Sequence, residues 1–155
     1  EMAGYNLEGS EVGAAFGLAQ LKKLQRNIKI RQDNFNAQSA FFEKYNEFFS
    51  NPKEKSNAST AWLAFPILIK ENTKFSRRDL QIYLEKREIQ TRVVFTGNIL
   101  RQPMMKSAKY KVSEMGYKNA DAIMERAFLL PVHHGLTEEM INRLHHTIDE
   151  FLESV

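Results

Sequence analysis

The sequence WLAFPILIK, from Trp62 to Lys70, decides the fold class, because it is a strand-forming stretch between segments that have helical periodicity. Its apolar and β-branched residues are typical of a strand that is at least half buried. Pro66 has no backbone N–H to donate to a neighbouring strand, so it favours an edge position or a bulge. The chain is therefore expected to combine a sheet with helices.

Upstream of this strand, apolar residues recur three or four positions apart from about Ser10 to Ser50, which predicts a long helix. Ser10 is the expected N-cap. At about 1.5 Å per residue, such a helix would extend about 60 Å, so we expect a kink near Asn27 or a projection against another body. Pro52 disfavours a helical conformation of Asn51 and ends the helix.

Downstream of the strand, helical and strand patterns alternate. The predicted elements are a helix that Ser76 caps and that ends near Glu88, a strand from Gln90 to Phe95, a helix that Asn119 caps and that ends at Arg126, a strand from Phe128 to Val132, and a last helix that Thr137 caps. Residues 99–115 are basic and have no clear period, so they are not assigned to an element.

This order of elements predicts a mixed α/β (α+β) fold. We expect a long N-terminal helix and a small, mainly antiparallel, three-stranded sheet that packs against helices. Residues 1–52 would form the lead-in and long helical segment, and residues 53–155 the small domain, within one compact unit. A chain of 155 residues that is 43% hydrophobic can bury one core of this kind.

The composition excludes several classes of protein. No apolar run approaches the roughly 18 residues of a membrane span, so no membrane partner is expected. The absence of cysteine excludes a disulfide framework, a thiolate metal site and a cysteine nucleophile. The N-terminal residues have no signal-peptide pattern, and we expect a protein of the cytoplasm.

Positive charge is concentrated in the middle of the chain. Residues 70–111 contain eleven basic and four acidic residues, whereas the rest of the chain contains eleven basic and fifteen acidic ones. A cationic segment in an acidic frame indicates an anionic partner, either a phosphorylated small molecule or a nucleic acid. A solvated face of lysines and arginines is the structural alternative.

Two further patterns, adjacent histidines and regularly spaced glycines, do not indicate a catalytic or metal site. The pairs at residues 133–134 and 145–146 are adjacent histidines, which point in different directions on a strand or a helix, so no metal site is expected. Gly9, Gly13 and Gly17 are spaced by four and would line one helix face. Because each glycine in a helix interior costs roughly 0.8–1 kcal/mol relative to alanine, close packing against another helix or subunit is the expected compensation.

The segment TRVVFTGNILRQP, residues 91–103, is the candidate ligand site. A predicted strand carries Arg92, a Gly-Asn turn follows at Asn98, and Arg101 and Gln102 close the loop. Two guanidinium groups and two amides around one turn suit a phosphate or a polyhydroxylated ligand, because arginine binds oxyanions through paired hydrogen bonds. A structural turn with exposed arginines would have the same sequence.

Two stretches together resemble a known family. GYNL at residues 4–7, followed by SEVGAAFGLAQL at residues 10–21, is similar to the start of the C-terminal domain in the DegT/DnrJ/EryC1/StrS family of pyridoxal-phosphate sugar aminotransferases and dehydratases. The segment 91–103 resembles the 3-dehydratase branch, which acts on nucleotide-linked 4-keto-6-deoxyhexoses in deoxysugar and lipopolysaccharide O-antigen biosynthesis. The LTEE sequence that enters the last helix also fits this family.

The resemblance implies the small C-terminal domain of a fold-type I enzyme, whose large domain holds pyridoxal phosphate or pyridoxamine phosphate. The cofactor anchor, lysine in aminotransferases and histidine in the 3-dehydratases, would lie upstream, so we expect a fragment that is inactive and binds no cofactor alone. Asn6 would reach the cofactor phosphate of the neighbouring subunit in a homodimer that packs through the glycine-rich helix. Arg92, Asn98, Arg101 and Gln102 would bind the nucleotide sugar.

Three alternatives stay open from the sequence. Within the family, a nucleotide-sugar aminotransferase differs from a dehydratase by the anchor residue. In another class, a small basic domain could bind nucleic acid, but Phe75, Tyr83 and Phe95 fit core positions, which leaves no exposed aromatic platform. A dimerisation module without catalytic activity is the third alternative.

Overall fold

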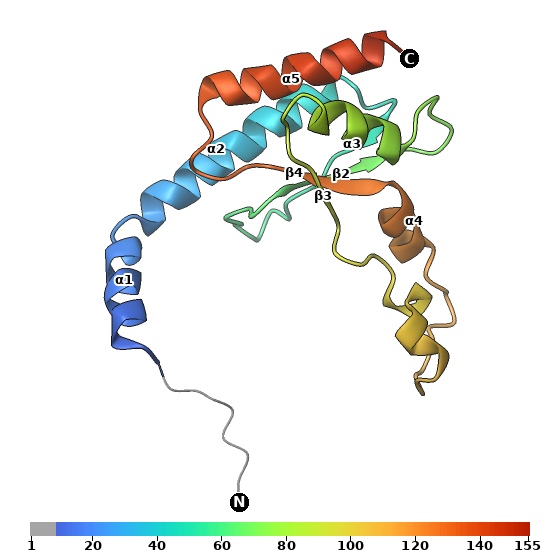
Figure 1. The fold of residues 1–155 in the computed structure, drawn as a ribbon, viewed down its shortest axis with the longest axis horizontal. Helices are drawn as coiled ribbons and strands as arrows, with labels where there is room; N and C mark the ends of the chain where they lie inside the picture. Colours follow the sequence, from blue (N-terminus) through green and yellow to red (C-terminus); the bar gives the residue numbers. More distant parts are fainter. Residues whose placement is uncertain (1–8) are drawn as a thin grey trace, which may run out of the picture.

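The computed structural model describes residues 9–155 (Figure 1). Its centre is a four-stranded antiparallel sheet of β1 (Phe49–Ser50), β2 (Phe65–Ile69), β3 (Arg92–Val93) and β4 (Ala127–Leu130), in the order β1-β2-β4-β3. The mixed α/β fold is confirmed. The predicted strand count is wrong by one, because Phe49 and Ser50, assigned to the long helix, pair with Ile69 and Leu68.

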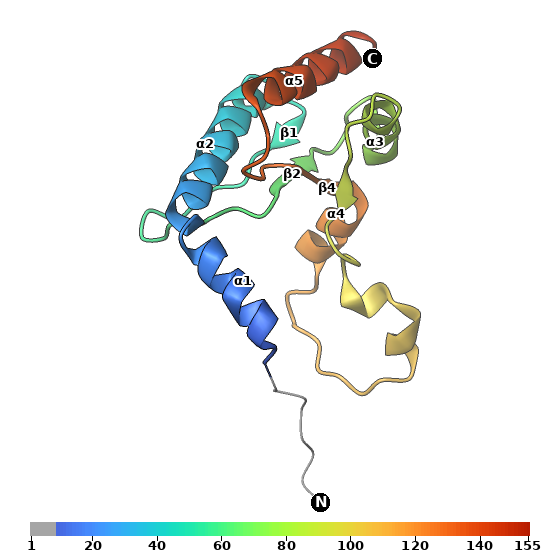
Figure 2. The same ribbon diagram turned by 60° about the vertical axis from the view of Figure 1, so that its left-hand side comes forward.

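The helices are α1 (Glu11–Leu21), α2 (Leu24–Glu43), α3 (Arg77–Glu85), α4 (Lys118–Arg126) and α5 (Glu138–Glu153), with two short 3₁₀ helices, η1 (Ile99–Arg101) and η2 (Pro103–Lys106). In Figure 1, α2, α3 and α5 gather above the sheet, whereas α1 and the segment that contains η1 and η2 extend below it. Figure 2 shows the same two segments as separate arms.

One hydrophobic core joins the sheet to the helices above it. Alternate residues of β2 are fully buried, and they meet apolar side chains from α2, α3 and α5. The largest fully buried members include Phe42, Phe65, Phe128, Leu80, Leu84 and Ile148. β2 is a central strand, but β1 pairs only as far as Leu68, so among the described strands β4 alone pairs with Pro66. The missing N–H of Pro66 is therefore tolerated at a locally one-sided position.

Three predicted N-caps are confirmed. The Ser10, Ser76 and Thr137 side chains accept hydrogen bonds from the backbone N–H groups of Gly13, Asp79 and Met140. At α3 the cap is reciprocal, since the Asp79 carboxylate also accepts from the Ser76 backbone N–H at 2.9 Å. The fourth predicted cap, Asn119, is wrong: α4 begins at Lys118 after Tyr117, which makes no side-chain cap bond.

The long helical segment is divided into α1 and α2, as expected, but the predicted position of the break is wrong. The chain breaks at Lys22 and Lys23, not near Asn27, and the Lys23 N–H closes a tight turn on the Gln20 carbonyl at 2.9 Å. No residue of α1 is buried, so packing does not hold α1 in line with α2, whose buried residues begin at Asn34. α2 itself ends at Glu43, well before Pro52.

The second and third strands are shorter than predicted. The Thr91 N–H donates to the Glu85 carboxylate at 2.6 Å instead of joining the sheet, and Phe95 has a positive φ of 51°, so β3 keeps only two residues. β4 begins one residue earlier, at Ala127, and ends before Pro131. Within residues 9–155, no helix is long and apolar enough to cross a membrane.

Candidate functional site

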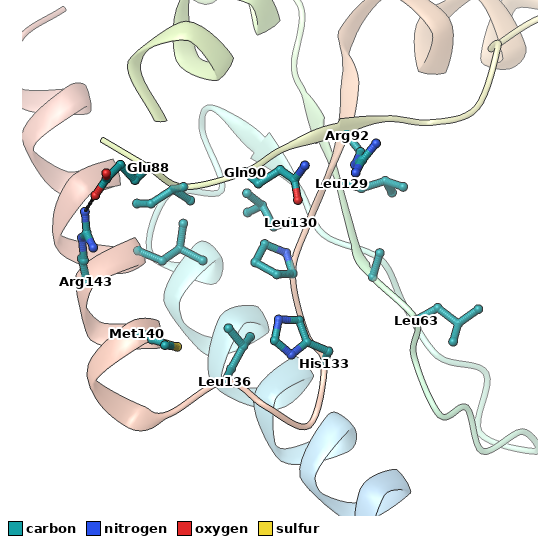
Figure 3. Close-up of a pocket in the computed structure, with 14 residues that line it drawn as sticks. Leu63, Glu88, Gln90, Arg92, Leu129, Leu130, His133, Leu136, Met140 and Arg143 are labelled. Atoms are coloured by element: carbon teal, nitrogen blue, oxygen red, sulfur yellow. Dashed lines mark ion pairs between the residues drawn. The ribbon is translucent and has the colours of Figure 1, made fainter. Parts of the chain in front are cut away.

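A cavity of about 410 Å³ opens at the end of the sheet where β3 begins and β4 ends (Figure 3). Its floor is apolar and comes from Leu63, Ala64, Ile89, Leu129, Leu130, Pro131, Leu136, Met140 and Leu144. Its polar lining residues are Glu88, Gln90, Arg92, His133 and Arg143. A largely apolar hollow with a few polar groups is the usual form of a small-molecule site, and its volume lies within the usual range.

Strand geometry places Arg92 at this cavity. Arg92 lies opposite Leu129 in the β3–β4 pair, and Leu129 lies opposite Pro66, so these three side chains share the sheet face turned away from the core. Gln90, two residues before Arg92, lines the same cavity. Figure 3 shows Gln90, Arg92 and His133 around the same hollow.

The two cavity arginines differ in their partners. Arg143 forms a 3.6 Å ion pair with Glu88 and donates from Nη2 to the Arg87 carbonyl at 2.7 Å. For Arg92, no carboxylate within residues 9–155 lies close enough to form an ion pair. Arg92 is exposed, so its guanidinium is available to an anion at the cavity.

The other predicted ligand residues form a separate cluster on the loop after β3. Arg101 donates from Nε and Nη2 to the two carboxylate oxygens of Asp121 in α4, at 2.8 and 2.6 Å. Asn98 donates from Nδ2 to the same carboxylate at 2.8 Å and is 4% exposed. The hydrogen bonds from Arg101, then from Asn98, lower the pKa of Asp121 to about 2.

Backbone hydrogen bonds complete the shape of this loop. The Asn98 Oδ1 accepts from the Leu100 N–H at 3.0 Å, and Gln102 donates from Nε2 to the Thr96 carbonyl at 2.9 Å. Both amides are thus used within the loop. Of the four residues that the sequence assigned to one site, Arg92 lines the cavity, and Asn98, Arg101 and Gln102 lie on the loop beyond its lining.

Sequence reasoning missed two members of these clusters. Gln90 could have been found, because its spacing of two from Arg92 is a strand signal. Asp121 could not, since it lies far along the chain from Asn98 and Arg101 and meets them only through the fold. Asn6, the expected contact to the cofactor phosphate, lies outside the described residues.

The aromatic residues give a mixed result. Phe75 is buried and Tyr83 packs partly buried against the core, as expected. Phe95 is 86% exposed, so its predicted core position is wrong; it lies at the tip of a turn with positive φ. Among residues 9–155, no group of three histidine, cysteine, aspartate or glutamate side chains is placed to hold a metal ion.

The architecture defines a class of protein: it is the small mixed α/β unit found in solved pyridoxal-phosphate sugar enzymes. The E. coli GDP-4-keto-6-deoxy-D-mannose-3-dehydratase with bound hydrated PLP superposes with a TM-score of 0.81 and 26% identity, over 94% of this chain and 37% of that one. An aminotransferase from Psychrobacter cryohalolentis has a TM-score of 0.83 over 100% of this chain and 42% of that one, but 16% identity, which indicates the shared fold alone.

The chain belongs to the DegT/DnrJ/EryC1/StrS aminotransferase family, which it matches over residues 1–149. It is 34% identical to the lipopolysaccharide biosynthesis protein RfbH of Salmonella typhimurium, over 96% of this chain and 34% of that protein. It is 30% identical to the GDP-4-keto-6-deoxy-D-mannose 3-dehydratase of Escherichia coli O55:H7, over 64% and 25%. The chain therefore spans about a third or less of the length of these relatives.

Proposed function

We propose that this chain is the nucleotide-sugar-binding part of a pyridoxal-phosphate-dependent 3-dehydratase, which removes the C3 hydroxyl of a nucleotide-linked 4-keto-6-deoxyhexose in deoxysugar and lipopolysaccharide biosynthesis. The observation that carries this proposal is the exposed Arg92, without an ion-pair partner among residues 9–155, beside an apolar cavity of about 410 Å³. Similarity to the 3-dehydratases of two enterobacterial species supports the reaction class.

The proposed role of the cavity follows from the chemistry of the substrate. A nucleotide sugar combines a planar base, a diphosphate and a polar sugar. The apolar floor suits the base or the sugar ring, the Arg92 guanidinium suits the diphosphate, and Gln90 can both donate and accept hydrogen bonds beside it. Arg101 would make a second contact to the anion from the loop after β3.

The substrate contacts expected for Asn98 and Gln102 stay a prediction. Their side-chain amides are already bonded to Asp121, to the Leu100 N–H and to the Thr96 carbonyl. We infer that their first task is to hold the loop in shape, because Asn98 is buried with both ends of its amide bonded, and Gln102 Nε2 donates to the Thr96 carbonyl.

Pyridoxal phosphate, or pyridoxamine phosphate, is the proposed cofactor of the whole enzyme and would supply the electron sink for loss of the hydroxyl group. The lining of the cavity includes no lysine that could bond covalently to the cofactor, and the anchor residue of either reaction is expected upstream of this chain. Asn6, the expected contact to the cofactor phosphate, lies outside the described residues. The role proposed for this chain is to bind and orient the sugar nucleotide.

We also propose that the enzyme is a homodimer that packs through α1. Val12, Phe16, Leu18 and Leu21 are between 62% and 79% exposed, an unusual density of apolar surface for one short helix. Among residues 9–155, a Cβ at Gly17 would meet nothing within 4 Å and one at Gly13 would meet only the Ser10 Cβ at 3.8 Å, so these two glycines do not serve close packing against the described part of the chain. They leave its surface open to a second copy.

The function is tested with the full-length enzyme carrying Arg92→Ala. We expect the KM for the nucleotide sugar to rise about tenfold or more, because a charge-assisted contact to the diphosphate is lost. Arg26→Ala is the matched control, since Arg26 is an exposed arginine of α2 and does not line the cavity. An unchanged KM for the Arg92 variant would contradict the proposed site.

A nucleotide-sugar aminotransferase is the second candidate. The chain is 27% identical to a UDP-4-amino-4,6-dideoxy-N-acetyl-beta-L-altrosamine transaminase of Campylobacter jejuni, over 98% of this chain. The identity of the upstream anchor residue, lysine or histidine, discriminates the two reactions. Product analysis with glutamate as amino donor provides the same test: an amino sugar indicates the transaminase, and a 3-deoxy sugar indicates the dehydratase.

A further inference from the structure

We propose that Asp121 is a positioning residue, which holds the Arg101 guanidinium by one edge so that its other edge faces the anionic substrate. The inference rests on the proposed function, in which Arg101 contacts the nucleotide sugar. It adds a residue of α4, remote in sequence, to the site formed after β3.

Arg101 and Asp121 form a bidentate contact of two hydrogen bonds. Nε of Arg101 donates to Oδ1 of Asp121 at 2.8 Å, and Nη2 donates to Oδ2 at 2.6 Å. Two parallel bonds fix the plane of the guanidinium as well as its position, which a single contact would not do. Nη1 keeps both of its N–H groups, and Nη2 keeps one, for another partner.

The same helix shapes the loop that carries Arg101. Asp121 also accepts from Asn98, three residues before Arg101. One helical turn further along α4, Met124 lies against Gly97, where an added Cβ would come within 2.4 Å of the methionine side chain. The loop from Gly97 to Arg101 therefore rests on one face of α4, and Asp121 is the polar contact on that face.

Stability alone is a weak explanation for this ion pair. The Arg101 side chain is 59% exposed and the Asp121 side chain is 35% exposed, and pairs of that kind add little to folding stability because water screens them. What the pair does supply is a fixed direction for the guanidinium. A preoriented arginine loses less conformational entropy when it binds an anion, so the benefit appears in substrate binding.

The test measures KM and kcat of the full-length enzyme carrying Asp121→Asn, Arg101→Ala and both changes. We expect Asp121→Asn to raise the KM for the nucleotide sugar about three- to tenfold while kcat changes less than about twofold, because only binding depends on the orientation of Arg101. In the Arg101→Ala background, Asp121→Asn should have no further effect on KM. Asp33→Asn, which breaks the exposed pair of Asp33 with Lys29 on α2, is the matched control.

Two results would overturn the proposal: an unchanged KM in Asp121→Asn while Arg101→Ala raises it, or an equal effect of Asp121→Asn with and without Arg101. If Arg101→Ala leaves the KM unchanged, the hypothesis that Arg101 contacts the substrate is refuted. The positioning role proposed for Asp121 fails with it, whereas a raised KM in Arg92→Ala would still support the proposed function of the cavity.

Discussion

At the scale of single residues, Gly97 is the position where the loop after β3 has least freedom. Its φ of +70° lies in the left-handed region, and an added Cβ would lie 2.4 Å from the Met124 side chain. Gly116 has nearly the same φ, +69°, but a Cβ there would meet nothing within 4 Å. The two glycines therefore separate the cost of the backbone conformation from the cost of the steric clash.

We expect Gly97→Ala to lower the free energy of unfolding by about 2–4 kcal/mol, because a clash is added to the strain of a left-handed residue. Gly116→Ala should cost only the conformational part, about 1 kcal/mol. Urea denaturation followed by circular dichroism measures both. Equal losses in the two variants would show that the contact with Met124 carries no energy.

His145 couples the packing of α2 and α5 to pH. Its ring stacks on Phe41 with centroids 4.0 Å apart, and its Nε2 is buried without a hydrogen-bond partner in the described part of the chain. Burial lowers the pKa of His145 from 6.5 to about 4, with Lys44 lowering it further and Asp149 opposing the shift. The folded state therefore favours the neutral imidazole.

Because the unfolded chain binds the proton more readily, we expect folding stability to be complete above pH 6.5 and to fall as the pH drops from 6.5 toward 4. His145→Gln should flatten this part of the profile. Denaturation midpoints at several pH values provide the measurement, with His134→Gln as the control at an exposed histidine. A slope that persists in His145→Gln would assign the effect to other groups.

At the scale of elements, the sequence predicts features that depend on neighbouring residues, such as helix caps. It does not predict features that depend on contacts between residues distant in sequence. The caps at Ser10, Ser76 and Thr137 follow from side chains beside their own helices, so the sequence predicts them correctly. The length of β3 cannot be predicted in this way, because the Glu85 carboxylate accepts the hydrogen bond of the Thr91 N–H. The strand β1 was hidden, since Phe49 continues the helical spacing of α2 but pairs with Ile69.

The helix caps should differ in how much they contribute to the free energy of unfolding. We expect Ser76→Ala to lower the free energy of unfolding by about 1 kcal/mol, because it removes a cap that is reciprocal with Asp79 on a helix that buries Leu80 and Leu84. Ser10→Ala should leave the unfolding transition of the chain unchanged, since α1 buries no residue. Denaturant midpoints of the two variants, at equal slope, test the contrast.

At the scale of the whole molecule, the exposed apolar side chains are unevenly distributed. Most of them belong to α1 and the start of α2, or to the segment between Val93 and Met115, which are the two arms that extend below the sheet. The sequence could not separate these arms from the core, because periodicity reports which residues share a face and not whether anything covers that face. The candidate ligand residues also lie in different places, since Arg92 lines the cavity and Arg101 is bonded to Asp121 of α4.

The dimer proposed through α1 has a direct test. We expect Phe16→Glu combined with Leu21→Glu to convert the full-length enzyme from dimer to monomer, because charge replaces apolar surface at the interface. Sedimentation velocity measures the change. Val112→Glu with Met115→Glu places the same charge on the other arm and should leave the dimer intact. If this control pair dissociates the dimer and the α1 pair does not, the interface lies on the other arm.

An isolated helix shorter than about 12–15 residues is marginal in water, and α1 has 11 residues, none of them buried. Its amide protons are therefore protected only to the extent that another surface shields the helix. The hydrogen-exchange rates of these amide protons, measured at several protein concentrations, would give the fraction of molecules in which that surface covers α1. The affinity of the assembly could then be read from one short peptide, without any substrate, cofactor or enzymatic assay.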